Sequence, residues 1–127
     1  MLYKEAQQKA KGRCTALEGY GPTSLDQKVT YGHLEAKGID AVLQISVVWF
    51  GLVGKWELNP PLNLEMDVQV KVIQVKEEKE LFSEIFHYSG GQRLFSEWCV
   101  ENARPLHDEF DRCYSDLADK IVTALFL

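Results

Sequence analysis

The segment LNLEMDVQVKV, residues 62–72, carries the clearest structural signal in the chain, because apolar and polar residues alternate along its whole length. Successive side chains of a β-strand point to opposite faces, so this period of two predicts a strand with one dry and one wet face. Such a strand is typical of an antiparallel sheet. The apolar series then shifts by one residue to Ile73 and Val75, which predicts a β-bulge at that point.

Two further strands are predicted on either side of this stretch. Residues 40–50 carry apolar side chains on both faces, as a central strand covered from two sides would. One of these faces consists of Leu43, Ile45, Val47 and Trp49. Polar residues 76–80 predict a hairpin turn, and residues 81–88 form the returning strand. The three strands would make an antiparallel meander.

Two helices and a short strand are predicted before the meander. Residues 2–11 have apolar side chains at every fourth position, which favours a helix, and residues 14–17 form the short strand. A second helix begins at Ser24, where Ser24 and Gln27 make a capping box, and it ends at Gly38.

The chain ends in a long predicted helix that begins at Ala103, with Pro105 in its first turn. Its apolar stripe consists of Leu106, Phe110, Cys113, Leu117, Ile121 and Leu125. This stripe is expected to pack on the dry side of the sheet. Asp108, Glu109 and Asp111 favour the positive end of the helix dipole. The sequence therefore predicts an α+β fold, an antiparallel meander of three main strands with helices on one face.

The composition restricts the function. The chain has 127 residues, of which 46% are hydrophobic and 26% are charged, with a net charge of −5. This size predicts a single domain covering residues 1–127. The negative charge argues against a nucleic-acid partner, which would need clustered Lys and Arg. No apolar run approaches the roughly 20 residues that a membrane helix requires. The three cysteines Cys14, Cys99 and Cys113 are too few for a disulfide scaffold; buried thiols are expected, with a single bridge as the alternative.

The residue types that commonly carry chemistry form no recognisable site. The histidines are His33, His87 and His107. None of them has a second ligand at metal-binding spacing, and no serine lies in G-x-S-x-G. Gly90 and Gly91 lack the other features of a phosphate-binding loop. Glu65 and Asp67 could resemble a catalytic carboxylate pair, but their position on the wet face of a strand already explains them. A Cys–His nucleophile pair stays open, because such partners meet in space. No catalytic residue, cofactor or metal is predicted.

The segment between the first two main strands is unusual for a loop. It begins at Gly51, ends at Pro61 and carries four apolar side chains: Leu52, Val53, Trp56 and Leu58. Exposed aromatic and aliphatic residues on a loop are typical of a protein-binding surface. The alternative is that these side chains fold back and pack on their own domain. The loop is therefore the candidate interaction site.

The order of elements resembles a group of bacterial envelope domains. The similarity begins at GIDAVL, residues 38–43, where a helix ending in Gly is followed by Asp and a strand. It continues through VQVKVIQV at residues 68–75, LFSE at residues 81–84 and DLADKIV at residues 116–122, and covers roughly residues 24–127. The group includes the TolB amino-terminal domain, the curli-secretion lipoprotein and the lipoprotein activators of penicillin-binding proteins. The group's first strand would precede Met1.

The resemblance implies a periplasmic, non-enzymatic domain, tethered to the outer membrane by an upstream lipid anchor. Its partners would be other envelope proteins, or a second copy bound through the loop from Gly51 to Pro61. The alternative is a small-molecule-binding domain, or an enzyme, with a pocket between helix and sheet, and with a cytoplasmic location as the other compartment. For that alternative Tyr88, His87 and Trp98 are the residues to inspect.

Overall fold

The structure is a computed structural model and describes residues 29–126. The predicted helix at residues 2–11, the predicted strand at residues 14–17 and the capping box of Ser24 and Gln27 lie outside the described residues. The elements are η1 (Gly32–Lys37), β1 (Ala41–Val53), β2 (Pro61–Gln74), β3 (Lys79–Ser89), β4 (Arg93–Leu94), α2 (Phe95–Trp98) and α3 (Val100–Phe126).

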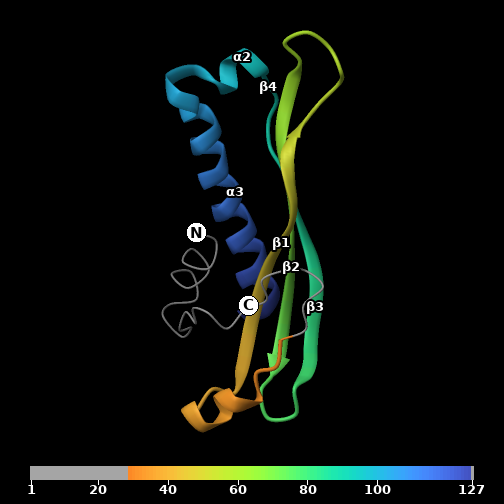
Figure 1. Ribbon diagram of the computed structural model, residues 1–127, viewed down its shortest axis with the longest axis vertical. Coiled ribbons are helices and arrows are strands. Elements are labelled where there is room, and N and C mark those ends of the chain that lie inside the picture. Colours follow the sequence, from red (N-terminus) through yellow and green to blue (C-terminus); the bar gives the residue numbers. More distant parts are fainter. Residues whose placement is uncertain (1–28, 127) are drawn as a thin grey trace.

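The α+β class is confirmed. The strand order is β1-β2-β3, with both neighbouring pairs antiparallel, and the long helix α3 runs beside the sheet (Figure 1). The two-residue strand β4 pairs with the start of β2 and, like the short helix α2, has no counterpart in the sequence expectations. Within residues 29–126, no helix is both long enough and apolar enough to cross a membrane.

The main core lies between β2 and α3. The dry face of β2 consists of Leu64, Met66, Val68 and Val70, and all four side chains are buried. They form one cluster with the stripe of α3, in which Cys113, Leu117 and Ile121 have no exposed surface. Each fully buried aliphatic side chain contributes about 1.5–3 kcal/mol, so this cluster holds the helix on the sheet. The alternation in residues 62–72 and the helix stripe were both interpreted correctly.

Two predictions for β1 are wrong, and a β-bulge explains the first of them. The register between β1 and β2 shifts between Val47 and Trp49, leaving Val48 as the extra residue. Before the shift Val47 lies opposite Val68, but after it Trp49 lies opposite Asp67. Cross-strand partners share a face, so Trp49 lies on the wet face and not beside Val47 as predicted. In addition, β1 is an edge strand of the described sheet, whereas residues 40–50 were predicted to be a central strand.

The helix predicted to end at Gly38 is shorter and tighter than expected in its described part. Tyr31 is not helical, and only the 3₁₀ helix η1 follows before Gly38 ends it with a φ of 75°. A second cluster forms here from Tyr31, Leu34, Val42 and Val75, with Ile73 packed against it. Ile73 and Val75 therefore belong to a separate small core. The bulge predicted at this point of β2 is wrong: the register between β2 and β3 does shift at Val72 and Ile73, but the extra residue is Leu81 of β3, and β2 stays in register with β1 there.

The start of α3 agrees with the sequence. Glu101, Asn102 and Ala103 have φ values of 50°, 58° and 62°, so they interrupt the helix. The regular helix follows Ala103 and places Pro105 in its first turn, where a proline costs little.

Candidate functional site

The loop between β1 and β2 projects from one end of the sheet (Figure 1). Leu52 packs against the main core, whereas Val53 is partly exposed. Trp56 and Leu58 are completely exposed and do not pack on the domain. Of the four candidate residues, Trp56 and Leu58 therefore present their whole side chains to solvent.

Close backbone contacts and hydrogen bonds determine the conformation of this loop. A Cβ atom at Gly54 would lie 2.3 Å from the carbonyl oxygen of Pro61, so only glycine fits there. Asn59 adopts a φ of 47°, a region that asparagine tolerates. Its Oδ1 accepts a hydrogen bond from the backbone N–H of Ser96 at 2.9 Å, and the N–H of Phe95 donates to the oxygen of Pro60 at 2.9 Å. The loop is thus tied to α2.

This attachment brings further apolar side chains to the same end of the molecule. Leu94 and Phe95 are both exposed and lie at the junction of β4 and α2. We refer to Val53, Trp56, Leu58, Leu94 and Phe95 as the hairpin end. No local pattern pointed to Leu94 and Phe95, because their place depends on the pairing of β4 with β2.

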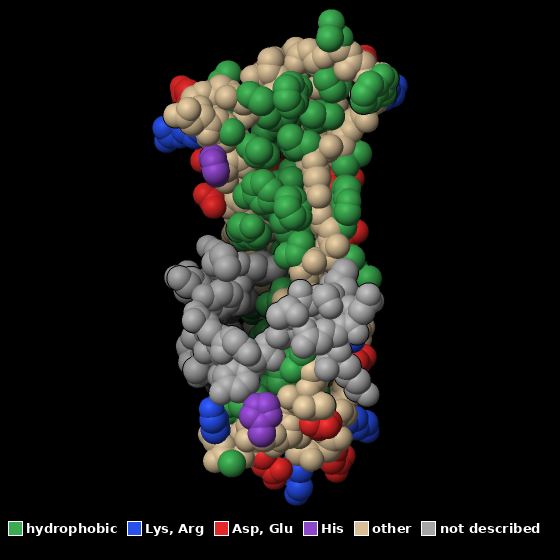
Figure 2. Space-filling model, in the orientation of Figure 1, with side chains coloured by type: hydrophobic (Ala, Val, Ile, Leu, Met, Phe, Trp, Pro, Cys, Tyr) green, Lys and Arg blue, Asp and Glu red, His purple; other side chains and the backbone are tan. Residues whose placement is uncertain are grey.

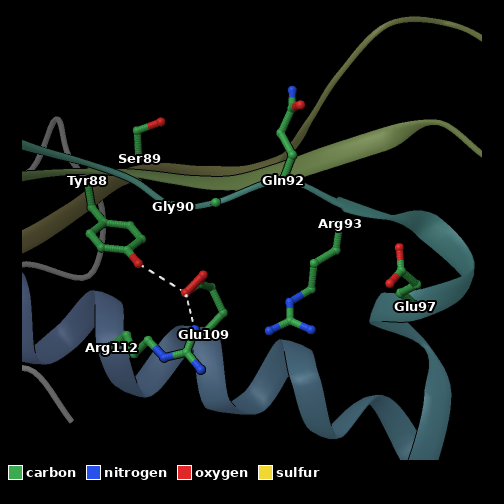
Figure 3. A pocket seen from close by; sticks show the side chains of 9 residues that line it. Tyr88, Ser89, Gly90, Gln92, Arg93, Glu97, Glu109 and Arg112 are labelled. Atoms are coloured by element: carbon green, nitrogen blue, oxygen red, sulfur yellow. Dashed lines mark hydrogen bonds and ion pairs between the residues drawn. The ribbon is translucent and has the colours of Figure 1, made fainter.

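A polar pocket lies beside the junction of β3 and β4. It has a volume of about 590 Å³, and Figure 3 shows Glu109 between Tyr88 and Arg112 at one side of it. Arg93 points toward α3 in the same view, and its guanidinium carbon lies 5.6 Å from the ring centroid of Trp98. The pocket is open and is lined mainly by polar and charged residues.

Glu109 is the buried carboxylate of this pocket, with 4% of its surface exposed. The hydroxyl of Tyr88 donates to its Oε1 at 3.1 Å, and Nη1 of Arg112 donates to the same oxygen at 3.3 Å. A Cβ atom at Gly90 would lie 2.8 Å from Oε2, so glycine leaves room for the carboxylate. These contacts join α3 to β3.

The sequence interpretation missed Glu109, which it assigned to the helix dipole. Glu109 lies four residues before Cys113, which in turn lies four residues before Leu117. This spacing places Glu109 on the buried face, and it was the signal that could have identified the residue.

The surroundings of Glu109 raise the pKa values of two neighbouring groups, the Tyr88 hydroxyl and the Cys113 thiol. Burial, together with the negative charge of Glu109, raises the pKa of Tyr88 to about 12. Burial also raises the pKa of the Cys113 thiol to about 12, with Asp116 and Glu109 acting in the same direction. Both groups are therefore protonated and uncharged at neutral pH.

Tyr88 should make stability fall in the alkaline range. Its pKa is about 12 in the folded state, against the ordinary tyrosine pKa of 10.0, so the folded state binds this proton more tightly. The contribution is complete below pH 10.0 and is lost as the pH rises toward 12. Tyr88→Phe should therefore lose less stability than the wild type across this window, measured by urea denaturation midpoints. Cys113 is present in both the wild type and Tyr88→Phe, so its contribution is the same in the two proteins. If stability fell equally with pH in both, Tyr88 would not be the source of the loss.

The other candidate residues are dispersed. His87 lies on the wet face, where its ring contacts Asp67 and Glu65 of β2. Trp98 is buried and donates from Nε1 to the oxygen of Leu62 at 3.0 Å. Of the three residues named for a pocket, Tyr88 lines the polar pocket described above, and His87 and Trp98 do not line it. No group of three or more His, Cys, Asp or Glu residues between positions 29 and 126 is arranged to hold a metal.

The cysteines that the structure describes are free thiols. Cys99 is exposed, and Cys113 is buried with its Sγ 3.7 Å from the sulfur of Met66. Cys14 lies outside the described residues.

Comparison with known protein families, with curated proteins and with solved structures finds no match for this chain.

Proposed function

We propose that this protein is a non-enzymatic protein-interaction domain of a bacterial cell-envelope lipoprotein, and that it binds its partner through the hairpin end. The complete exposure of Trp56 and Leu58 carries the proposal. Tryptophan is frequent among the residues that dominate binding energy, and apolar side chains that remain in water favour association.

The ties of the loop to α2 support the same proposal. Asn59 accepts a hydrogen bond from the backbone of Ser96, and Gly54 lies close to Pro61. The loop that carries the apolar side chains is therefore held in one conformation. A surface already ordered before binding loses less conformational entropy when the partner docks. Leu94 and Phe95 enlarge the apolar area next to the loop.

The alternative of a small-molecule site has less support. Pockets for small molecules are mostly apolar, with a few polar groups that orient the ligand. The pocket beside Tyr88 is instead lined largely by polar and charged residues, and the space between β2 and α3 is filled by buried side chains.

The envelope location rests on the resemblance of residues 24–127 to envelope domains. It implies a periplasmic domain attached to the outer membrane through a lipid anchor, with other envelope proteins as partners. Fractionation of the native host tests this location. Recovery of the protein with membranes or periplasm agrees with the proposal, and recovery with the cytoplasm contradicts it.

The double variant Trp56→Ala/Leu58→Ala should weaken partner binding by about tenfold or more, because apolar anchors of an interface cost above 1 kcal/mol when truncated. The partner is first captured in the host with a photo-reactive residue at position 56. A photo-reactive residue at Ile85 of β3, which is also exposed, is the matched control.

Affinity for the captured protein is then measured with the wild type and the double variant. The melting temperature should stay unchanged, since the two side chains have no packing to lose. Unchanged affinity, or equal capture from position 85, would remove the hairpin end from the interface.

A further inference from the structure

Strand β1 forms one edge of the described sheet and is unusually free of charge. Its 13 residues, AVLQISVVWFGLV, contain no Asp, Glu, Lys or Arg and no proline. No strand among residues 29–126 pairs with its outer side. Edge strands present unpaired N–H and C=O groups, and natural proteins usually protect them with charges, prolines or a cover.

The opposite edge of the sheet has this protection. Strand β3 has the sequence KELFSEIFHYS, with charged residues at Lys79, Glu80 and Glu84. All three are exposed. Charged side chains therefore protect the β3 edge of the sheet from pairing with another strand, whereas the β1 edge has no such charges.

The apolar side chains of β1 are also exposed in its second half. The exposed fractions are 45% for Val47, 37% for Val48, 47% for Trp49 and 57% for Phe50. Figure 2 shows hydrophobic side chains gathered between α3 and β1 in the upper part of the view. The bulge at Val48 places Trp49 on one face and Phe50 on the other, where the Phe50 ring meets that of Phe110 at 5.8 Å.

We propose that β1 pairs in an antiparallel manner with β1 of a second copy of this chain, giving one continuous sheet. A two-fold axis at Val48 would bring Val47, Val48 and Trp49 of each copy against the same three residues of the other. Because β1 carries no charge, two chains of net charge −5 would meet at a neutral edge.

The composition of β1 favours a second copy over another partner. The strand has no charged group that would select an acidic or a basic partner, so charge complementarity gives it no specificity for one. Its apolar segment is complementary to itself in the antiparallel direction. In this arrangement the two hairpin ends point in opposite directions, and both stay available for the partner proposed above.

The mass of the full-length protein in solution, measured by light scattering after size exclusion, tests the pairing. The wild type should be a dimer. Val47→Lys should raise the dimer dissociation constant by about tenfold or more, because it puts a charge into the apolar contact and brings it near the like charge of the other copy, diagonally across the axis. Ile85→Lys, at an exposed position of β3, is the matched control and should remain dimeric.

Cysteine cross-linking gives a second measurement that does not depend on destabilising the strand. Val48→Cys, with Cys14 and Cys99 replaced by serine, should form a disulfide-linked dimer on mild oxidation, and Ile85→Cys in the same background should not. A monomeric wild type overturns the proposal. So does a dimer that Trp56→Ala/Leu58→Ala abolishes and Val47→Lys leaves intact, since the hairpin end would then be the dimer contact.

Discussion

Replacing Trp98 with alanine should lower the free energy of unfolding by about 3–5 kcal/mol. Trp98 is 1% exposed, and its Nε1 donates to the backbone oxygen of Leu62 at 3.0 Å. The guanidinium of Arg93 also lies over its ring. The side chain therefore anchors the segment before α3 to the first residues of β2, and alanine would leave a large cavity and an unpaired carbonyl. Urea denaturation measures the change.

The same substitution at Trp56 is the matched control. Trp56 is completely exposed, so Trp56→Ala should change stability by no more than about 0.5 kcal/mol. Trp98→Phe keeps an aromatic ring but loses the hydrogen bond to Leu62, and it should cost about 1–3 kcal/mol. If Trp98→Ala proved as stable as Trp56→Ala, Trp98 would not be part of the core, and a ligand-facing role would have to be considered again.

Replacing Leu117 with alanine should destabilise the fold by about 2–5 kcal/mol. Leu117 has no exposed surface and belongs to the cluster that α3 forms with Leu64, Met66, Val68 and Val70. These residues hold the only long helix among residues 29–126 against the sheet, so a cavity there weakens the contact between the two layers. The denaturation midpoint in urea measures the effect.

Thr123→Ala is the control for this helix, because Thr123 is an exposed residue of α3. Its stability change should stay within about 0.5 kcal/mol. An unchanged midpoint for Leu117→Ala would mean that α3 is not docked on the sheet as described.

Both variants bear on function as well as on stability. The core between α3 and β2 is filled by buried side chains, and Trp98 is buried as well. Large losses of stability in the Trp98 and Leu117 variants would support a fully packed interior. Binding to other proteins would then take place at the surface. Surface variants at Trp56 and Val47 then test those contacts without disturbing the core.

Elements whose signal is a local period could be predicted from the order of residues alone. Alternation in residues 62–72 gave β2, spacing of three and four residues gave the α3 stripe, and the polar residues 76–80 gave the turn into β3. Gly38 ends η1 with a positive φ because glycine has no Cβ that would clash. These features depend on neighbours within a few positions, so the order of residues is enough to predict them.

Which side chains those elements bury could be seen only in the folded molecule. One extra residue at Val48 moved Trp49 to the wet face, and because residues 47–50 are all apolar, the local pattern does not mark this bulge. Glu109 is buried because Gly90 and Tyr88 lie opposite it. Trp56 stays in water whereas Trp98 is enclosed. Burial depends on which surfaces meet across long separations in the chain, and hydrophobicity along the sequence does not contain that information.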